Sequence, residues 1–139
     1  MTDEIQTRLD QAALARAEDR PAHARNGYAQ AAALSRETGK PLLRAFALRH
    51  LSDLDRLGGK PAEALGHAEQ AVALYRRHSP GAQQDIANAV RLMALALDDL
   101  GRGEAAIGAW TEARDGYAAT GATEGVTECD ARLNTVDED

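Results

Sequence analysis

The stretch LGGKPAEAL, Leu57–Leu65, is followed 43 positions later by a shorter version, LGRGEAAI, at Leu100–Ile107. Gly58 and Gly59 are expected to end one helix, because glycine accepts the left-handed backbone that closes a helix C-terminus. Pro61 is expected to begin the next helix, because proline lacks the N–H that the first turn leaves unpaired. The same marks recur along the chain. The other starts are Pro21, Pro41 and Pro80, and the other stops are Gly39, Gly101 and Gly121.

These marks divide the chain into seven segments, and each segment has the residue pattern of a helix. Apolar residues recur at i, i+3 and i+4, and no run alternates apolar and polar residues as a half-buried strand does. Ser79 is the expected N-cap of the helix that begins at Pro80. The predicted fold class is therefore all-α, with helices over residues 3–19, 21–38, 41–57, 61–78, 80–100, 103–120 and 122–134.

Alternate helices align with one another, which reveals an internal repeat. Small residues coincide, and a shared position between them holds Tyr28, Ala68 and Trp110. The unit is a helix hairpin of 40 to 42 residues, and such a hairpin buries its apolar face only by stacking on the next copy. The aligned small residues are Ala24, Ala64 and Ala106, and then Ala31, Ala71 and Ala113.

The repeat resembles the tetratricopeptide repeat family. The resemblance rests on the Leu-Gly turn, on the Ala, aromatic, Ala series of each second helix, and on small residues in each first helix, which are Ala12, Ser52 and Ala94. The period exceeds the roughly 34 residues usual in the family, which indicates longer helices. The resemblance implies one domain over residues 1–139, built as a right-handed α-solenoid. Its parts are repeats over about 3–38, 41–78 and 80–120, a capping helix over about 122–134 and an acidic tail over 135–139.

Charge and composition exclude several classes of protein. The net charge is -6, which argues against nucleic-acid binding, because that requires a basic surface. No apolar run approaches the roughly 20 residues that cross a bilayer, so no membrane partner is expected. With Cys129 as the single cysteine and no signal peptide, a cytoplasmic location is expected. An excess of arginine over lysine, 14 to 2, suggests a bacterium with a GC-rich genome.

No combination of residues in the sequence indicates an enzyme, a metal site or a cofactor. His23, His50, His67 and His78 do not form a zinc motif of the His-Glu-x-x-His kind. The pairs Glu63 with His67 and His50 with Asp53 share helix faces, as exposed polar neighbours often do.

Four less polar side chains have expected positions inside the fold. Trp110 is expected in the core, since it occupies the aromatic position of the repeat. Cys129 lies between Glu128 and Asp130 and is expected to be a small apolar residue under the last helix. Tyr75 and Tyr117 lie further along their helices, where partial exposure is expected.

An arginine recurs in the first helix of each hairpin and again in the last helix. Arg8, Arg49, Arg91 and Arg132 are separated by 41, 42 and 41 positions. First helices line the concave groove of tetratricopeptide folds, so the resemblance implies guanidinium groups along that groove. A guanidinium binds carboxylates through two parallel hydrogen bonds. The same register places further groove candidates at Phe46, His50, Asp53, Arg56, Asn88, Leu92, Leu95 and Asp98.

The arginine series has two interpretations, and both stay open at the level of sequence. In the first, the arginines bind a ligand, and the chain is a protein-interaction module whose groove accepts a peptide or protein segment with acidic positions. In the second, they form internal ion pairs, such as Arg49 with Asp53 at i, i+4, or Arg91 with a carboxylate on a neighbouring helix.

An alternative function is self-assembly, in which the groove or the terminal helices contact other copies of the chain. The predicted helix 122–134 carries Val126, Cys129 and Leu133 on one face, which could cap the last repeat or dock on a second chain to form a homo-oligomer. The best-known site of the family binds the C-terminal carboxylate of a chaperone tail. Its asparagine is replaced here by Asp53, so that particular function is not expected.

Overall fold

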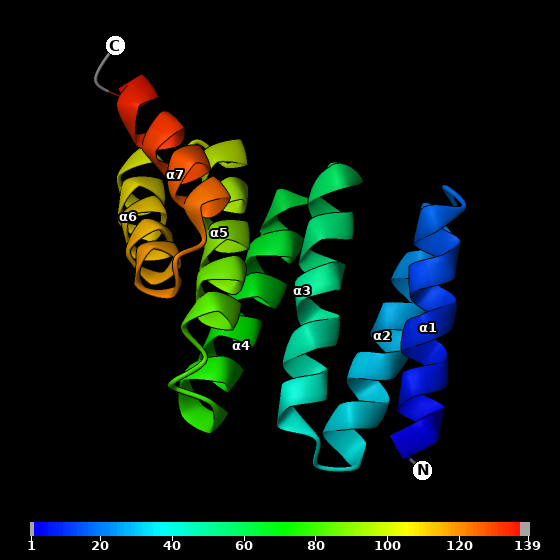
Figure 1. Cartoon of the computed structure of the whole chain (residues 1–139). Helices are drawn as coiled ribbons and strands as arrows, with labels where there is room; N and C mark the ends of the chain where they lie inside the picture. The colour runs from blue at the N-terminus through cyan, green and yellow to red at the C-terminus, as the bar shows by residue number, and fades with distance from the viewer. Residues whose placement is uncertain (1, 137–139) are drawn as a thin grey trace.

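The computed structural model describes residues 2–136, and this part of the chain folds into seven α-helices without a β-strand (Figure 1). The predicted all-α class is confirmed. The helices are α1 Thr2–Ala17, α2 Pro21–Glu37, α3 Pro41–Leu57, α4 Pro61–His78, α5 Gln83–Asp99, α6 Gly103–Thr120 and α7 Thr123–Val136. No helix among these described residues is long and apolar enough to cross a membrane.

The turn of the opening stretch is used at five junctions of similar geometry. In each, a residue with positive φ follows the helix, and the next residue donates its N–H to a carbonyl five positions back, as in Lys60 to Asp55 at 2.8 Å. Such a bond satisfies a carbonyl that the end of the helix leaves unpaired. Glycine supplies the positive φ at Gly39, Gly59, Gly101 and Gly121, and Asp19 supplies it at the first junction with φ 56°. Aspartate reaches this region more readily than most residues.

The junction between α4 and α5 differs from the prediction. α5 begins at Gln83 and not at Pro80, and Ser79 does not cap it. The Ser79 N–H donates to the Tyr75 carbonyl and ends α4, and the Ser79 carbonyl accepts from Ala82 at 3.0 Å. Pro80 therefore occupies the second position of a turn, where its fixed φ is also favourable. At the other end, α7 continues through Val136, so two residues of the predicted acidic tail are helical, and residues 137–139 lie outside the described part.

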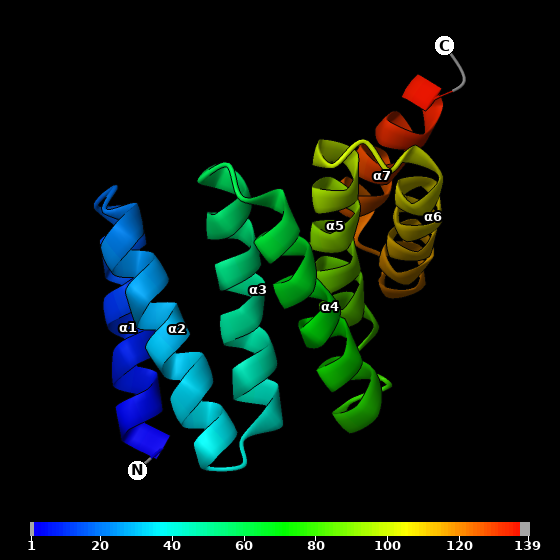
Figure 2. The same ribbon diagram turned by 180° about the vertical axis from the view of Figure 1, so that it is seen from behind.

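Each helix packs against the next one along the chain, and α3 also contacts α5. The odd-numbered helices form one layer, which faces the viewer in Figure 1, and the even-numbered helices α2, α4 and α6 lie behind it. The reverse view in Figure 2 brings this second layer forward. The two ends of the chain lie at opposite ends of the row (Figures 1 and 2). Three successive odd helices, α1, α3 and α5, therefore present one shared face.

The repeat positions form the core. The aligned alanines, together with Tyr28 and Trp110, are buried between the layers, because small side chains let neighbouring helices approach closely. Trp110 and Cys129 are buried as predicted. Tyr75 and Tyr117, expected to be partly exposed, are each only 4% exposed. Their hydroxyl groups have polar partners inside the fold, which makes the burial of these side chains acceptable.

Candidate functional site

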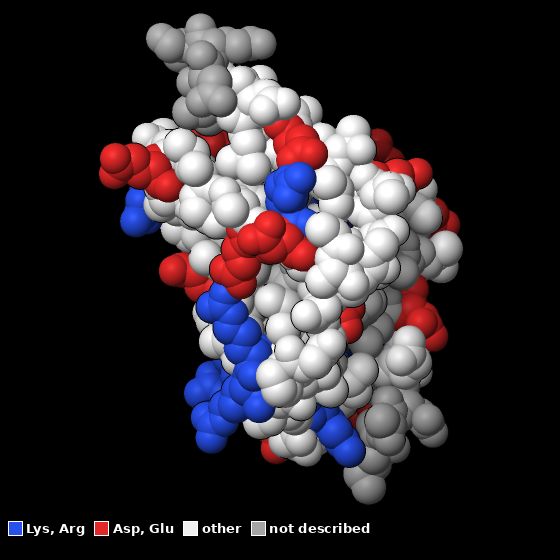
Figure 3. Space-filling view, turned by 60° about the vertical axis from the view of Figure 1, so that its left-hand side comes forward, with Lys and Arg blue, Asp and Glu red and all other residues white. Residues whose placement is uncertain are grey.

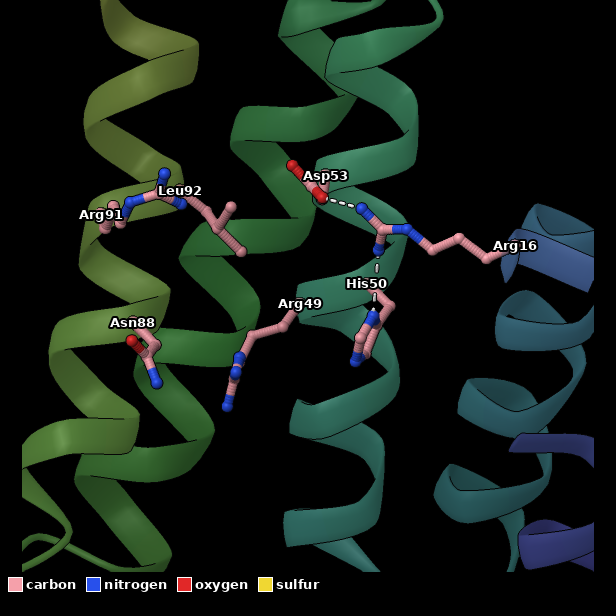
Figure 4. A pocket seen from close by; sticks show the side chains of 7 residues that line it. All are labelled: Arg16, Arg49, His50, Asp53, Asn88, Arg91 and Leu92. Carbon is pink, nitrogen blue, oxygen red and sulfur yellow. Dashed lines mark hydrogen bonds and ion pairs between the residues drawn. The ribbon is translucent and has the colours of Figure 1, made fainter. Parts of the chain in front are cut away.

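A pocket of about 210 Å³ lies on the face shared by α1, α3 and α5 (Figure 4). The structure brings together five of the predicted site residues and Leu92 from two hairpins, and adds from a third hairpin Arg16, which the sequence register did not identify. The lining residues are Arg16, Arg49, His50, Asp53, Asn88, Arg91 and Leu92.

Arg16 reaches from α1 to α3 and joins the two helices at the pocket. Its guanidinium donates to the Asp53 carboxylate, and its Nη1 lies 3.2 Å from Nδ1 of His50 (Figure 4). Because a guanidinium only donates, Nδ1 must be the acceptor, and the proton of the neutral ring is then on Nε2. The pKa of His50 is lowered to about 4, chiefly by burial and also by the charges of Arg16 and Arg49, against the opposing effect of Asp53. His50 is therefore neutral at pH 7 and carries an Nε2–H donor.

The ring of His50 is held in one orientation by two aromatic neighbours. It stacks on Tyr28 with ring centroids 4.5 Å apart and planes 5° from parallel, and it meets Phe46 edge-on at 4.7 Å. Such contacts contribute about 0.5–1.5 kcal/mol beyond the burial of area. Together with the bond to Arg16, they fix the direction of the Nε2–H group before any ligand arrives.

Arg49 and Asn88 point from facing helices into the same space (Figure 4). Arg49 is 19% exposed, and its Nη1 lies 3.3 Å from the Tyr75 hydroxyl and 3.5 Å from the Asp85 carboxylate. The expected pair of Arg49 with Asp53 is not formed, because Arg16 occupies Asp53. Asn88 accepts from the Tyr117 hydroxyl at 2.7 Å through its Oδ1, which leaves its NH₂ group able to donate.

Arg91 is committed to an internal ion pair. Its Nε and Nη2 donate to the two carboxylate oxygens of Glu128 on α7, at 2.6 and 2.9 Å. These hydrogen bonds lower the pKa of Glu128, against the raising effect of its partial burial. The second interpretation of the arginine series, a pair with a carboxylate on a neighbouring helix, is thus confirmed for Arg91.

The remaining predicted site residues lie outside this pocket. Arg8 contacts Glu4 at 3.4 Å and donates to Gln30 on α2. Arg8 lies four positions before the small residue Ala12, whereas Arg49 lies three before Ser52, and one position rotates a side chain by about 100° around a helix. Leu95 is buried in the core and offers no surface.

Three of these residues lie near the C-terminal ends of odd-numbered helices, Arg56 on α3, Asp98 on α5 and Arg132 on α7. Arg132 pairs with Asp98 at 3.7 Å and lies over the Trp110 ring, 5.3 Å from its centroid. The Trp110 indole N–H donates to the same Asp98 carboxylate at 2.9 Å. Arg56 pairs with Asp99 on α5 at 3.5 Å.

Three of the four repeated arginines therefore form ion pairs between odd-numbered helices, which are Arg49 with Asp85, Arg91 with Glu128 and Arg132 with Asp98. Arg16 and Arg56, which do not belong to the repeat, add pairs with Asp53 from α1 to α3 and with Asp99 from α3 to α5. Each partly exposed pair contributes about 0–1 kcal/mol. The surface around α6 and α7 has the same character, since basic and acidic side chains are interspersed on the face in Figure 3.

A second polar cluster, which sequence reasoning missed, lies inside the fold. The Asp55 carboxylate is fully buried, and it accepts from Arg25 Nε at 2.6 Å and from His67 Nδ1 at 2.8 Å. The three groups come from α3, α2 and α4, so the cluster joins three helices. Their separations along the chain are 30 and 12 positions, which match no short motif.

Among the described residues, no group of three or more His, Cys, Asp or Glu side chains could hold a metal ion. No protein-family model matches the chain, and no curated protein matches it. The resemblance to tetratricopeptide repeats therefore rests on the sequence pattern of this chain alone.

Proposed function

We propose that the chain is a tetratricopeptide-like, right-handed α-solenoid of three hairpins capped by α7, and that it binds an acidic segment of another protein. The binding site is the pocket between α1, α3 and α5. The observation that carries the proposal is that this pocket presents hydrogen-bond donors whose acceptors, within the described part of the chain, are weak or missing. Support for the architecture comes from the recurring turn, the repeated alanines and the two-layered row of helices.

Three donors converge on the pocket. They are the guanidinium of Arg49, the NH₂ group of Asn88 and the Nε2–H of His50. The carboxylate in the lining, Asp53, is already bound by Arg16. A ligand that donates hydrogen bonds would therefore find no free carboxylate in the lining, whereas a carboxylate would accept from all three donors. The chemistry favours an aspartate or glutamate side chain as the group that is bound.

Arg49 is the arginine best suited to contact this ligand. Arg16 and Arg91 each have a carboxylate at close range, while the nearest carboxylate to Arg49 is 3.5 Å away and belongs to the exposed Asp85. Binding a ligand through Arg49 therefore breaks no strong internal pair. The aromatic contacts of His50 reduce the ordering cost of binding, because this donor is already fixed.

Self-assembly through α7 has less support. Val126 and Leu133 pack against the core of their own chain, and Cys129 is buried there. The apolar face that could have docked on a second copy is thus largely covered. Sedimentation at several protein concentrations tests this alternative directly, since a monomer at all concentrations removes it.

The experiment is a selection of random 12-residue peptides displayed on phage against the purified protein, followed by affinity measurements on the selected peptides. We expect enrichment of sequences that contain Asp or Glu. Arg49→Gln should weaken their binding about tenfold, as expected for the loss of one charge-assisted contact, and should reduce the salt dependence. Arg8→Gln is the matched control, because it removes the same charge outside the pocket.

Two outcomes would contradict the proposal. One is a selection that enriches no acidic peptide. The other is an equal effect of Arg49→Gln and Arg8→Gln on the selected peptides. Unchanged helicity and melting temperature of both variants, measured by circular dichroism, exclude loss of folding as the cause of weaker binding.

A further inference from the structure

We infer that the bound segment is an extended peptide in which one acidic side chain is flanked on both sides by large apolar side chains. This inference rests on the proposed function and specifies its ligand. It follows from the apolar surface that lies on either side of the pocket along α3.

α3 carries a continuous stripe across the shared face of the odd-numbered helices. Its members follow the spacing of one helix face, and apolar residues lie at both ends with polar residues between them. Of the five exposed large hydrophobic side chains in the described part of the chain, three lie on this stripe: Leu42, Phe46 and Leu57, which are 44%, 38% and 66% exposed. The polar residues between them are His50 and Asp53.

The apolar residues border the pocket directly. On one side, the Phe46 ring contacts the His50 ring at 4.7 Å, and the Arg49 guanidinium lies 5.8 Å from the centre of the Phe46 ring. On the other side, Leu57 and Leu54 line a second hollow of about 370 Å³ together with Pro21. Arg16 lines both hollows, so they adjoin each other across its side chain.

The order along α3 is therefore apolar, donor-rich and apolar. A segment with a carboxylate in the middle position complements this order in charge and in polarity. An acidic segment without apolar neighbours would leave Phe46 and Leu57 exposed to water, while a purely apolar segment would leave Arg49 with only its long contacts of 3.3 and 3.5 Å.

The positions on α3 set the spacing in the ligand. With a rise of about 1.5 Å per helical residue, Phe46 lies about 6 Å from His50 along the axis, and Leu57 lies about 10 Å from His50 on the other side. An extended peptide advances about 3.3 Å per residue, so these distances correspond to about two and three peptide residues, and because its side chains alternate between two faces, only even spacings bring them to the same face. The expected pattern is therefore apolar-x-acidic-x-x-x-apolar, or the same pattern in reverse.

The occupant is an extended peptide because the middle hollow is small. A volume of about 210 Å³ admits a side chain with its backbone, but an α-helix with its side chains is about 10–12 Å across. A helix also advances less per residue than an extended peptide, so a helical segment of the same number of residues would not reach both apolar sites.

The test uses fluorescent synthetic peptides with amidated C-termini, so that no terminal carboxylate contributes. The two orders of the pattern are LSESSSL and LSSSESL, the apolar control is ASESSSA, and the acidic control is LSQSSSL. We expect one of the leucine-containing acidic peptides to bind at least about tenfold more tightly than ASESSSA and than LSQSSSL, as measured by fluorescence anisotropy.

Protein variants then locate the apolar contact. Leu57→Ser should reduce the preference for leucine over alanine in the peptide to about twofold or less. Leu14→Ser is the matched control, since Leu14 is 59% exposed on α1 and lines neither hollow, and it should leave the preference unchanged. Both replaced side chains are exposed, so neither change should unfold the protein.

The outcomes separate the inference from the function on which it rests. If ASESSSA binds as tightly as the leucine peptides, and all of them depend on Arg49, the inference is wrong and the acidic site stands. An equal loss of preference in Leu57→Ser and Leu14→Ser also overturns the inference. If no peptide binds, or if binding is unaffected by Arg49→Gln, both proposals fall.

Discussion

Replacing Arg25 by Ala should destabilise the protein more than replacing its buried partner, Asp55. The Asp55 carboxylate has no exposed surface, while the Arg25 side chain is 39% exposed. Removing Arg25 leaves a carboxylate that water cannot reach, with His67 as its one remaining side-chain donor among the described residues. Removing Asp55 leaves a guanidinium that water can solvate from its exposed side. The asymmetry follows from which partner is buried.

The magnitudes follow from the burial of each group. Breaking a buried pair by removing one partner costs about 3–5 kcal/mol, and the remaining bond from His67 places Arg25→Ala near the lower end, at about 3 kcal/mol. Asp55→Ala loses two hydrogen bonds but leaves no buried charge, so we expect about 1–2 kcal/mol. The double variant should cost about as much as Asp55→Ala alone, which corresponds to a coupling of about 3 kcal/mol, the full cost of Arg25→Ala.

Urea denaturation of the wild type, both single variants and the double variant, followed by circular dichroism at pH 8, measures all four free energies of unfolding. Domains of this size have a stability of about 5–15 kcal/mol, so a loss of 3 kcal/mol leaves a measurable folded baseline. Additive costs, or a smaller cost for Arg25→Ala than for Asp55→Ala, would refute the reasoning. Arg8→Ala is a suitable control, because its contacts lie on the surface and it should cost less than about 1 kcal/mol.

Three further predictions follow from single residues. Because the pKa of His50 falls from 6.5 to about 4 on folding, the unfolded chain binds more protons than the folded chain between these values. The free energy of unfolding should therefore decrease as the pH falls from 6.5 to 4, by at most about 1.4 kcal/mol per pH unit. Urea titrations of His50→Gln should lack this component, and identical pH profiles of the variant and the wild type would contradict it. Burial raises the pKa of the Cys129 thiol to about 11, so little of the reactive thiolate is present at pH 8. A chromogenic disulfide reagent at this pH should therefore label Cys129 at least about a hundredfold more slowly in the native protein than in urea. Equal labelling rates would contradict the burial of this side chain. Gly27→Ala should lower the melting temperature, because the added Cβ would lie 2.7 Å from Cβ of Ala12. Gly108→Ala is the control, since its added Cβ meets nothing within 4 Å and should stabilise α6 by about 0.5–1 kcal/mol. A higher melting temperature for Gly27→Ala would contradict the prediction and show that the helices separate at little cost.

The helices could be predicted because their boundaries are local. A proline or glycine determines its own φ, and amphipathic spacing needs only the residues of one helix. The first junction was predicted from Pro21, but its positive-φ residue was not, because Asp19 takes the conformation that glycine takes elsewhere and aspartate is common in many other settings. Pro80 was misassigned because the same fixed φ suits a turn and the first turn of a helix.

The candidate site could be predicted in outline, because the register places equivalent residues of the first helices on one face. Arg49, His50 and Asp53 meet Asn88 and Arg91 for this reason. The ion-pair partners could not be predicted, because each pair depends on the packing of helices that lie more than 30 positions apart, as in Arg16 with Asp53 and Arg91 with Glu128. A difference of one position also removed Arg8 from the pocket, although its spacing from Arg49 matched that between Arg91 and Arg132.

The arginine repeat attracted a functional interpretation through its periodicity, yet its periodic members mostly stabilise the contacts between neighbouring helices. Duplication copies a packing contact as readily as a binding contact, so a regular spacing cannot distinguish between them. What distinguishes Arg49 is the strength of its internal contacts, since it has two bonds of 3.3 and 3.5 Å where Arg91 has a two-pronged bond at 2.6 and 2.9 Å. A charged group that is mostly buried but loosely paired gains more from a ligand than one that is fully paired. For this reason the peptide-binding proposal depends on the residue that departs from the pairing scheme, and Arg49→Gln is the variant that tests it most directly.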